Sequence, residues 1–168
     1  MNTLSRGKTC CFTGYRPEKL PWGFDEGDPR CARLAQRLYD FAEALYLSGI
    51  RRYLCGMALG SDMLFCQAVI RLRALHPEIV LEAAIPFPGQ SDRWPEQARE
   101  RYLELLHGCS RITVLSEQYT PACMRERNEY MVNQSSVLVA VYDGKRGGTM
   151  MTVNYAKKQG LEILQIMP

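Results

Sequence analysis

The sequence has little histidine and no long apolar run. Its histidines are His76 and His107, which fall near the ends of predicted helices, so we expect neither a metal site nor catalysis by a histidine base. No apolar stretch approaches the ~20 residues that cross a bilayer, and residues 1–8 show no apolar core of a signal peptide. These absences predict a cytoplasmic protein without a membrane partner.

Neither sign of charge dominates the sequence. The formal net charge is +3 with 23% charged residues, and no run of like charge forms a tail. Pairs of basic residues are scattered over several predicted helices, which is typical of solvated helix faces. This pattern makes a nucleic-acid partner an unfavoured prediction, but it is compatible with an anionic ligand.

The sequence also lacks a disulfide or zinc pattern. It has seven cysteines, an odd number, and none of them form a C-x-x-C pair. Most lie inside apolar runs, so we expect buried thiols in a reducing compartment. The cysteines are Cys10, Cys11, Cys31, Cys55, Cys66, Cys109 and Cys123.

What the sequence does contain is a regular alternation of strand and helix patterns. Its 168 residues fit a single domain, 1–168. Six strands and five helices predict an α/β fold, a Rossmann-like three-layer sandwich whose mostly parallel sheet is joined by right-handed crossovers. We expect a strand order near 3-2-1 followed by the later strands. The predicted strands are 9–13, 52–55, 79–85, 112–115, 136–142 and 162–167.

Capping residues and apolar periodicity set the predicted helices. Asp28 and Pro29 open the first helix, which Gly49 stops. Ser91 or Asp92 is expected to cap the third helix. The predicted helices are 28–49, 61–75, 91–107, 120–133 and 148–159, and the segment 15–27 is the one long irregular stretch.

Glycine, small hydroxyls and arginine follow several of these strands. Ligands of open parallel sheets bind outside the carboxyl ends of the strands. Gly147, Gly148 and Thr149 lie between a buried strand and a helix start, where free N–H groups accept an anion, and Lys145 or Arg146 would add charge. The same residues would also serve as a plain turn, because neither G-x-x-x-x-G-K-[ST] nor G-x-G-x-x-G is present.

The turn after the second strand repeats this design. Gly56 and Gly60 bracket it, and Ser61 and Asp62 begin the next helix. Ser61 would act as an N-cap and Asp62 would complement the helix dipole. The functional alternative is that Asp62 binds a ribose hydroxyl or orients Arg16.

Arginines and aromatic residues complete the candidate site. Gly14 with Arg16 would form a further phosphate contact, and Phe87 would stack on a base. Trp94 would do the same or cover the core at a helix start. The other candidates are Gln90, Arg127, Asn128 and Asp143, with Glu129 and Asp62 as weak catalytic candidates.

The order of these motifs resembles the YpsA-like family of the SLOG superfamily, over nearly the whole chain. The motifs are Thr13–Pro17, Gly56–Asp62, Ile85–Phe87 with Gln90 and Trp94, Arg127–Asn128, and Tyr142–Asp143 followed by Gly147–Thr149. The resemblance implies a Rossmann-like fold, binding of nucleotides or ADP-ribose-like ligands, and a possible homodimer. The superfamily also contains phosphoribohydrolases and a DNA-processing protein that acts on single strands.

The sequence departs from the hydrolase members of that superfamily. They resemble one another in a Pro-Gly-Gly-x-Gly-Thr-x-x-Glu signature, whereas residues 145–152 here read KRGGTMMT. The proline, one glycine and the glutamate are missing. We therefore expect binding or sensing of a nucleotide-derived ligand, with no cofactor required. The alternatives are a nucleotide N-glycosidase or phosphoribohydrolase, and a single-stranded nucleic-acid or protein-docking module.

Overall fold

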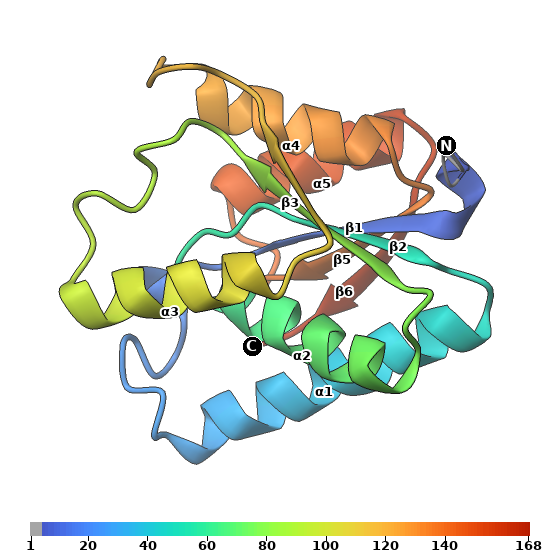
Figure 1. Cartoon of the computed structure of the whole chain (residues 1–168), viewed down its shortest axis with the longest axis horizontal. Coiled ribbons are helices and arrows are strands. Elements are labelled where there is room, and N and C mark those ends of the chain that lie inside the picture. The colour runs from blue at the N-terminus through green and yellow to red at the C-terminus, as the bar shows by residue number, and fades with distance from the viewer. Residues whose placement is uncertain (1–4) are drawn as a thin grey trace.

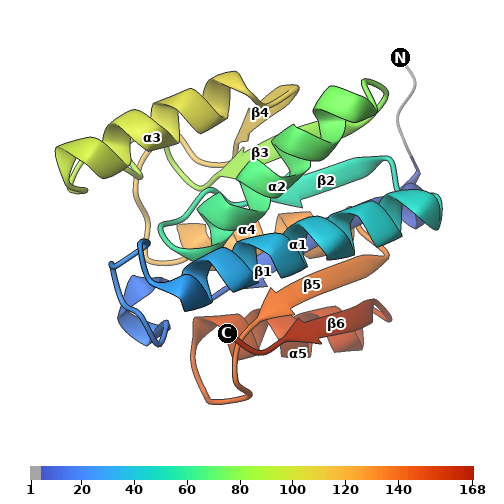
Figure 2. The ribbon, with the colours of Figure 1, turned by 90° about the horizontal axis from the view of Figure 1, so that it is seen from below.

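Residues 5–168, described in a computed structural model, form one parallel sheet between two helical layers. The six strands in these residues lie in the order β4-β3-β2-β1-β5-β6, and every neighbouring pair is parallel. Helices α4 and α5 cover one face, and α1, α2 and α3 cover the other (Figures 1 and 2). The predicted Rossmann-like α/β fold is confirmed, as is the 3-2-1 run within the strand order.

The elements agree closely with the sequence pattern. The strands are β1 Thr9–Gly14, β2 Arg52–Cys55, β3 Val80–Ile85, β4 Arg111–Val114, β5 Val137–Val141 and β6 Glu162–Ile166. The helices are α1 Pro29–Leu47, α2 Ser61–Leu75, α3 Glu96–His107, α4 Cys123–Asn133 and α5 Gly148–Lys158. The cap of α1 is confirmed, because the Asp28 carboxylate accepts a hydrogen bond from the Arg30 N–H at 2.8 Å.

Two predicted helix starts are wrong. Helix α3 begins at Glu96, after a run of turns in which the Trp94 N–H donates to the Ser91 carbonyl. Pro95 disfavours helical backbone in the residue before it, so the helix cannot extend back to Asp92. Helix α4 begins at Cys123, two residues after Pro121.

Helix α2 has the predicted bounds, but its N-cap is a glycine and not Ser61. Gly60 holds that position with a φ of 92°, and Ser61 is the first helical residue. Its hydroxyl donates instead to the Tyr15 carbonyl at 2.8 Å, so it joins α2 to the chain that follows β1.

The core lies on both faces of the central strands. Every residue of β5 is buried, as expected for a central strand with helices on both sides. Phe12 and Phe65 stack with their ring centroids 4.5 Å apart. All seven cysteines are free and six are buried, and burial raises the pKa of Cys11 to about 12. The expectation of buried thiols is confirmed.

An unforeseen charged cluster lies between the sheet and α4. Glu82, in the middle of β3, is fully buried and pairs with Arg52 at 3.0 Å and with Arg111 at 3.5 Å. The Tyr130 hydroxyl on α4 donates to the same carboxylate at 2.8 Å. These bonds satisfy a charge that burial alone would penalise heavily.

Replacing Leu138 with alanine tests how tightly the central strand is packed. The Leu138 side chain is fully buried, so its loss leaves a cavity that lowers the free energy of unfolding by about 2–5 kcal/mol. Urea denaturation measures this loss. Leu75→Ala, at a position 68% exposed, is the control and shifts stability by less than about 0.5 kcal/mol. Equal effects of the two variants would contradict this packing.

Candidate functional site

A cavity of about 310 Å³ opens where β1 and β5 end and where α2 and α5 begin. Its volume is near the lower end of the range for small-molecule sites. We call it the edge cavity. It is lined by Phe12, Thr13, Gly14, Tyr15, Arg16, Glu18, Lys19, Ala58, Asp62, Met124, Arg127, Asn128, Gly148 and Thr149.

One wall is the junction between β1 and α2. The Tyr15 carbonyl accepts hydrogen bonds from the Ser61 N–H at 3.1 Å and the Ser61 hydroxyl at 2.8 Å. A Cβ at Gly14 would collide with that hydroxyl, and a Cβ at Gly60 would lie 2.8 Å from the Tyr15 oxygen. Gly60 is therefore required by close contact between two backbones, and Gly14 by the Ser61 side chain that joins them.

A buried cation from α4 forms the opposite wall. The Arg127 side chain donates from Nη1 to the Gly56 carbonyl and from Nε to Asn128 Oδ1 at 2.8 Å. Its guanidinium would be only 2.5 Å from a Cβ at Gly56, so this glycine makes room for the arginine. Burial lowers the pKa of Arg127, but guanidinium groups stay charged in proteins.

Asp62 supplies the buried carboxylate of the edge cavity. It is 6% exposed, and its Oδ2 accepts a hydrogen bond from the Ala58 N–H at 2.9 Å. Burial raises the pKa of Asp62, while the charge of Arg127 opposes this increase. The cavity thus holds two opposite buried charges, anchored to the backbone of the same 56–62 turn.

The start of α5 closes the other side. Gly148 and Thr149 line the cavity, and the first N–H groups of a helix have no partner within it. A Cβ at Gly147 would collide with Lys19 Nζ, which lies 5.4 Å from the centre of the Tyr15 ring. The helix dipole and the Lys19 ammonium therefore favour an anion at this end.

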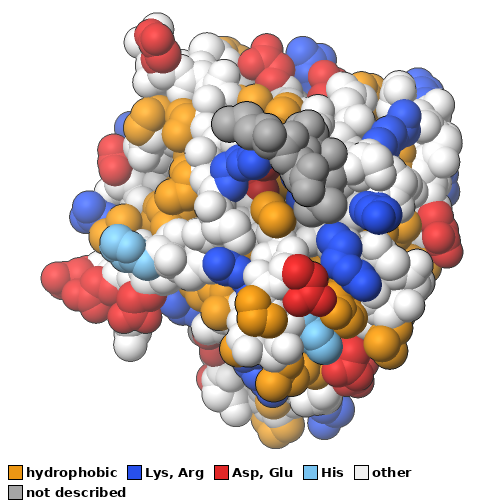
Figure 3. Space-filling model, turned by 45° about the vertical axis from the view of Figure 1, so that its right-hand side comes forward, with side chains coloured by type: hydrophobic (Ala, Val, Ile, Leu, Met, Phe, Trp, Pro, Cys, Tyr) orange, Lys and Arg blue, Asp and Glu red, His pale blue; other side chains and the backbone are white. Residues whose placement is uncertain are grey.

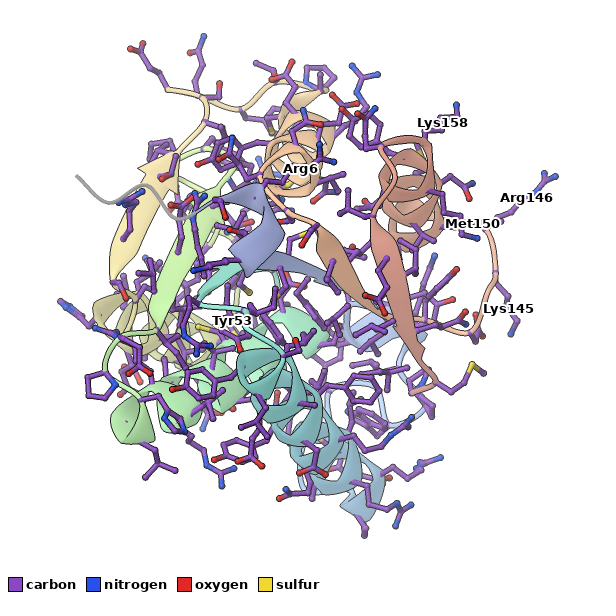
Figure 4. The ribbon with its side chains drawn as sticks, turned by 90° about the vertical axis from the view of Figure 1, so that its right-hand side faces the viewer. Arg6, Tyr53, Lys145, Arg146, Met150 and Lys158 are labelled. Atoms are coloured by element: carbon purple, nitrogen blue, oxygen red, sulfur yellow. The ribbon has the colours of Figure 1, made fainter. Side chains whose placement is uncertain are left out.

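The cations that the sequence suggested for this end do not line the cavity. Lys145 is 83% exposed and pairs with Asp143 at 3.1 Å, and both Lys145 and Arg146 point outward from their loop (Figure 4). Asp143 accepts a hydrogen bond from the Tyr15 hydroxyl, which lowers the pKa of Asp143 to about 2. Its contribution is to hold the Tyr15 ring in the cavity wall.

The predicted site residues divide into three groups. The first group lines the cavity: Gly14, Arg16, Asp62, Arg127, Asn128, Gly148 and Thr149. The second supports it from behind: Gly56, Gly60, Ser61, Asp143 and Gly147. Gln90 also belongs there, because its amide donates to the Gly56 and Met57 carbonyls at 3.3 Å.

The third group lies elsewhere. Phe87 packs against Tyr119 at 5.5 Å between ring centroids. Trp94 packs against Tyr102 at 5.2 Å and covers the core, which was the alternative interpretation of it. Glu129 is on α4, outside the edge cavity, with Arg125 at 3.9 Å.

Sequence reasoning missed Lys19 and Tyr15 as cavity residues. Both belong to the segment 15–27, whose length marks a functional loop but whose composition does not show which side chain turns inward. The structure brings Lys19 next to Gly147, 128 positions later in the sequence. Only the pairing of β1 with β5 creates that proximity.

The described part of the chain offers no metal centre. Within residues 5–168, no three His, Cys, Asp or Glu side chains are grouped to hold a metal ion. Over the same residues, no helix has both the length and the apolarity to cross a bilayer. The groups that the edge cavity offers to a ligand are hydrogen-bonding groups and charged side chains.

These features define a Rossmann-like α/β protein with a glycine-lined cavity at the carboxyl edge of its sheet. The chain belongs to the YspA SLOG family, whose model matches residues 10–167. It is 33% identical over 144 residues to the uncharacterized SPbeta prophage-derived protein YoqJ of Bacillus subtilis, covering 78% of this chain and 84% of that protein. It is 31% identical over 156 residues to a UPF0398 protein of Halalkalibacterium halodurans, covering 90% and 82%.

Two solved structures share the fold. DNA processing protein A from Helicobacter pylori, described for its single-stranded DNA binding mode, superposes with a TM-score of 0.65 at 16% identity. The match covers 96% of this chain and 65% of that one. DNA processing protein A from Streptococcus pneumoniae gives a TM-score of 0.62 at 16% identity, covering 95% and 50%.

The raised pKa of Asp62 predicts a pH-dependent stability. The unfolded chain loses this proton near the ordinary pKa of 3.8, before the folded protein does, so this group lowers stability as pH rises toward the folded-state pKa. Asp62→Asn carries no such proton. We expect the free energy of unfolding of this variant, relative to wild type, to increase as the pH rises above about 4.

Urea denaturation at several pH values measures this difference. Asp92→Asn, at an exposed position, is the control. A difference between Asp62→Asn and wild type that is independent of pH would contradict the burial of an ionisable carboxyl group at this position.

Proposed function

We propose that the edge cavity binds a phosphate-bearing sugar or nucleotide, so that the chain acts as a binding or sensing domain. The observation that carries this proposal is the start of α5, where Gly148 and Thr149 open onto the cavity and Lys19 Nζ lies against Gly147. A helix N-terminus next to an ammonium group is a favourable place for phosphate.

The rest of the cavity suits a sugar. Asp62 and Asn128 face the same space, and a carboxylate and an amide are the groups that accept and donate hydrogen bonds to sugar hydroxyls. Because Asp62 is bound to the Ala58 N–H and Arg127 to the Gly56 carbonyl, these polar groups are positioned before a ligand arrives. Such preorganisation lowers the entropy cost of binding.

Hydrolysis of the bound nucleotide would have to depend on Asp62. Glu129 lies outside the cavity, and the α5 segment carries Met151 and Thr152 near the place of the missing glutamate. Glu18 also lines the cavity but is exposed. This distribution supports binding over N-glycosidic cleavage, and release of free base from nucleoside monophosphates by wild type but not by Asp62→Asn would reverse that preference.

The first variant that tests the proposed phosphate site removes the ammonium group of Lys19. Losing a charged hydrogen bond to phosphate weakens binding by about 1.5–3 kcal/mol, or about 10-fold to 150-fold in Kd. We expect Lys19→Gln to show this loss for ribose 5-phosphate in isothermal titration. Wild type at about 100 times its Kd gains about 2.7 kcal/mol of stability from the ligand, which a thermal-shift measurement detects.

Lys157→Gln is the matched control, because Lys157 is exposed on α5 and does not line the edge cavity. It should bind ribose 5-phosphate as wild type does. The proposal fails if wild type binds neither ribose 5-phosphate nor any of a panel of AMP, ADP and ADP-ribose.

The second candidate function is binding of single-stranded nucleic acid. It is favoured by the fold shared with a protein described for single-stranded DNA binding and by the exposed Arg16 and Lys19 at the cavity. On the face in Figure 3, which is turned toward the side of the N-terminus, basic side chains are interspersed with acidic and apolar ones among the described residues and form no continuous basic strip. Fluorescence anisotropy with an oligothymidylate would show a steep fall of affinity with salt if this function holds. No binding at low salt would exclude it.

A further inference from the structure

A second cavity adjoins the edge cavity at the start of α5. It lies between α4 and α5, has a volume of about 480 Å³, and shares Met124, Asn128 and Gly148 with the edge cavity. We call it the α4/α5 groove. Its remaining lining residues are Pro121, Arg125, Glu129, Met151, Thr152, Asn154, Tyr155 and Lys158.

The two cavities meet at Gly148, which lines both of them. A Cβ placed there would meet no atom within 4 Å, so the first residue of α5 borders open space. Gly148 and Met151 are three residues apart and therefore lie on the same side of the helix, about 4.5 Å apart along its axis. A ligand anchored at the start of α5 needs to extend by only one turn to reach the groove.

Most of the exposed surface of the groove is apolar, although Arg125, Glu129 and Lys158 add charges to its lining. Met124 and Met151 contribute thioethers, which adapt to flat ring faces and contact aromatic systems favourably. Met151 is 64% exposed. The Asn128 amide uses its oxygen to accept from Arg127 Nε, which leaves its NH₂ group to donate, and Asn154 supplies a second amide.

This composition matches a nucleobase better than a second phosphate or sugar. A nucleobase has two apolar faces and a polar edge that both donates and accepts hydrogen bonds. Methionine side chains suit the faces, and asparagine amides suit the edge. A plain sugar phosphate would fill the edge cavity and leave this groove empty.

We infer that the α4/α5 groove is the base subsite of a 5′-nucleotide whose phosphate binds at the start of α5. This inference rests on the proposed function and narrows it, because it separates nucleotides from sugar phosphates as ligands. Asn128 and Gly148, which line both cavities, mark where the nucleotide passes from one cavity to the other, and Met151 forms the outer wall against the base.

The experiment compares ribose 5-phosphate with AMP, GMP, CMP and UMP by isothermal titration. Wild type is expected to bind at least one of the four nucleotides about tenfold or more tightly than ribose 5-phosphate, because only the nucleotides occupy the groove. Met151→Gln keeps a helix-forming side chain but removes the thioether. It should weaken the affinity for that nucleotide about twofold to tenfold and leave the affinity for ribose 5-phosphate unchanged.

Leu75→Gln is the matched control, since Leu75 is 68% exposed at the end of α2 and lines neither cavity. It should bind every ligand as wild type does. Lys19→Gln should weaken the affinities for ribose 5-phosphate and for the nucleotide by the same factor. The different effects of Lys19→Gln and Met151→Gln distinguish the phosphate subsite from the base subsite.

Two binding results would overturn the inference while leaving the proposed function intact. One is equal affinity for ribose 5-phosphate and all four nucleotides. The other is a nucleotide affinity that Met151→Gln does not change. If sedimentation shows a dimer in wild type that Met151→Gln dissociates, a second copy of the chain covers the groove and the inference also fails. If no ligand binds, the proposed function fails with it.

Discussion

The contact between the end of β1 and the start of α2 is the constraint on which the site depends. The Tyr15 carbonyl accepts two hydrogen bonds from Ser61, and glycines at 14 and 60 allow the two backbones to approach. Any side chain at either glycine would separate them. Because this contact sets the direction of the chain after Tyr15, it also determines where Arg16 and Lys19 lie at the edge cavity.

The two charged groups of the edge cavity are each fixed by a hydrogen bond to the backbone. Asp62 is bound through the Ala58 N–H and Arg127 through the Gly56 carbonyl, so each charge is attached to the backbone of one turn. Two buried opposite charges that formed a direct pair would satisfy each other, whereas groups attached to backbone retain capacity for a ligand. Burying them costs stability, and the proposed binding role would account for that cost.

The sequence predicts the fold well because the fold follows local signals. Alternating apolar periods, the Asp28 cap and the continuous run of β5 identify the elements, and parallel pairing then gathers the glycine turns at one edge. The errors arise where a signal is ambiguous or distant. Ser91, Asp92 and Ser61 look like caps, but Pro95 and the positive φ of Gly60 set the boundaries. Lys19 and Tyr15 acquire their positions through contacts with residues more than 120 positions away, which no local pattern reveals.

Under the proposed function, the start of α5 separates the requirements for binding an anion from the requirements for cleaving its ester or glycoside. Binding an anion there needs backbone N–H groups, a glycine that admits close approach and a neighbouring cation, and Gly147, Gly148 and Lys19 meet these needs without any acidic side chain. Cleavage would need a carboxylate one turn further along α5, where the chain has Met151 and Thr152. Thr152 stands at that position and Met151 precedes it, so α5 carries a hydroxyl and an apolar side chain where a hydrolase would carry an acid. The proposed anion site in the first turn of α5 therefore does not depend on an acidic side chain in the second.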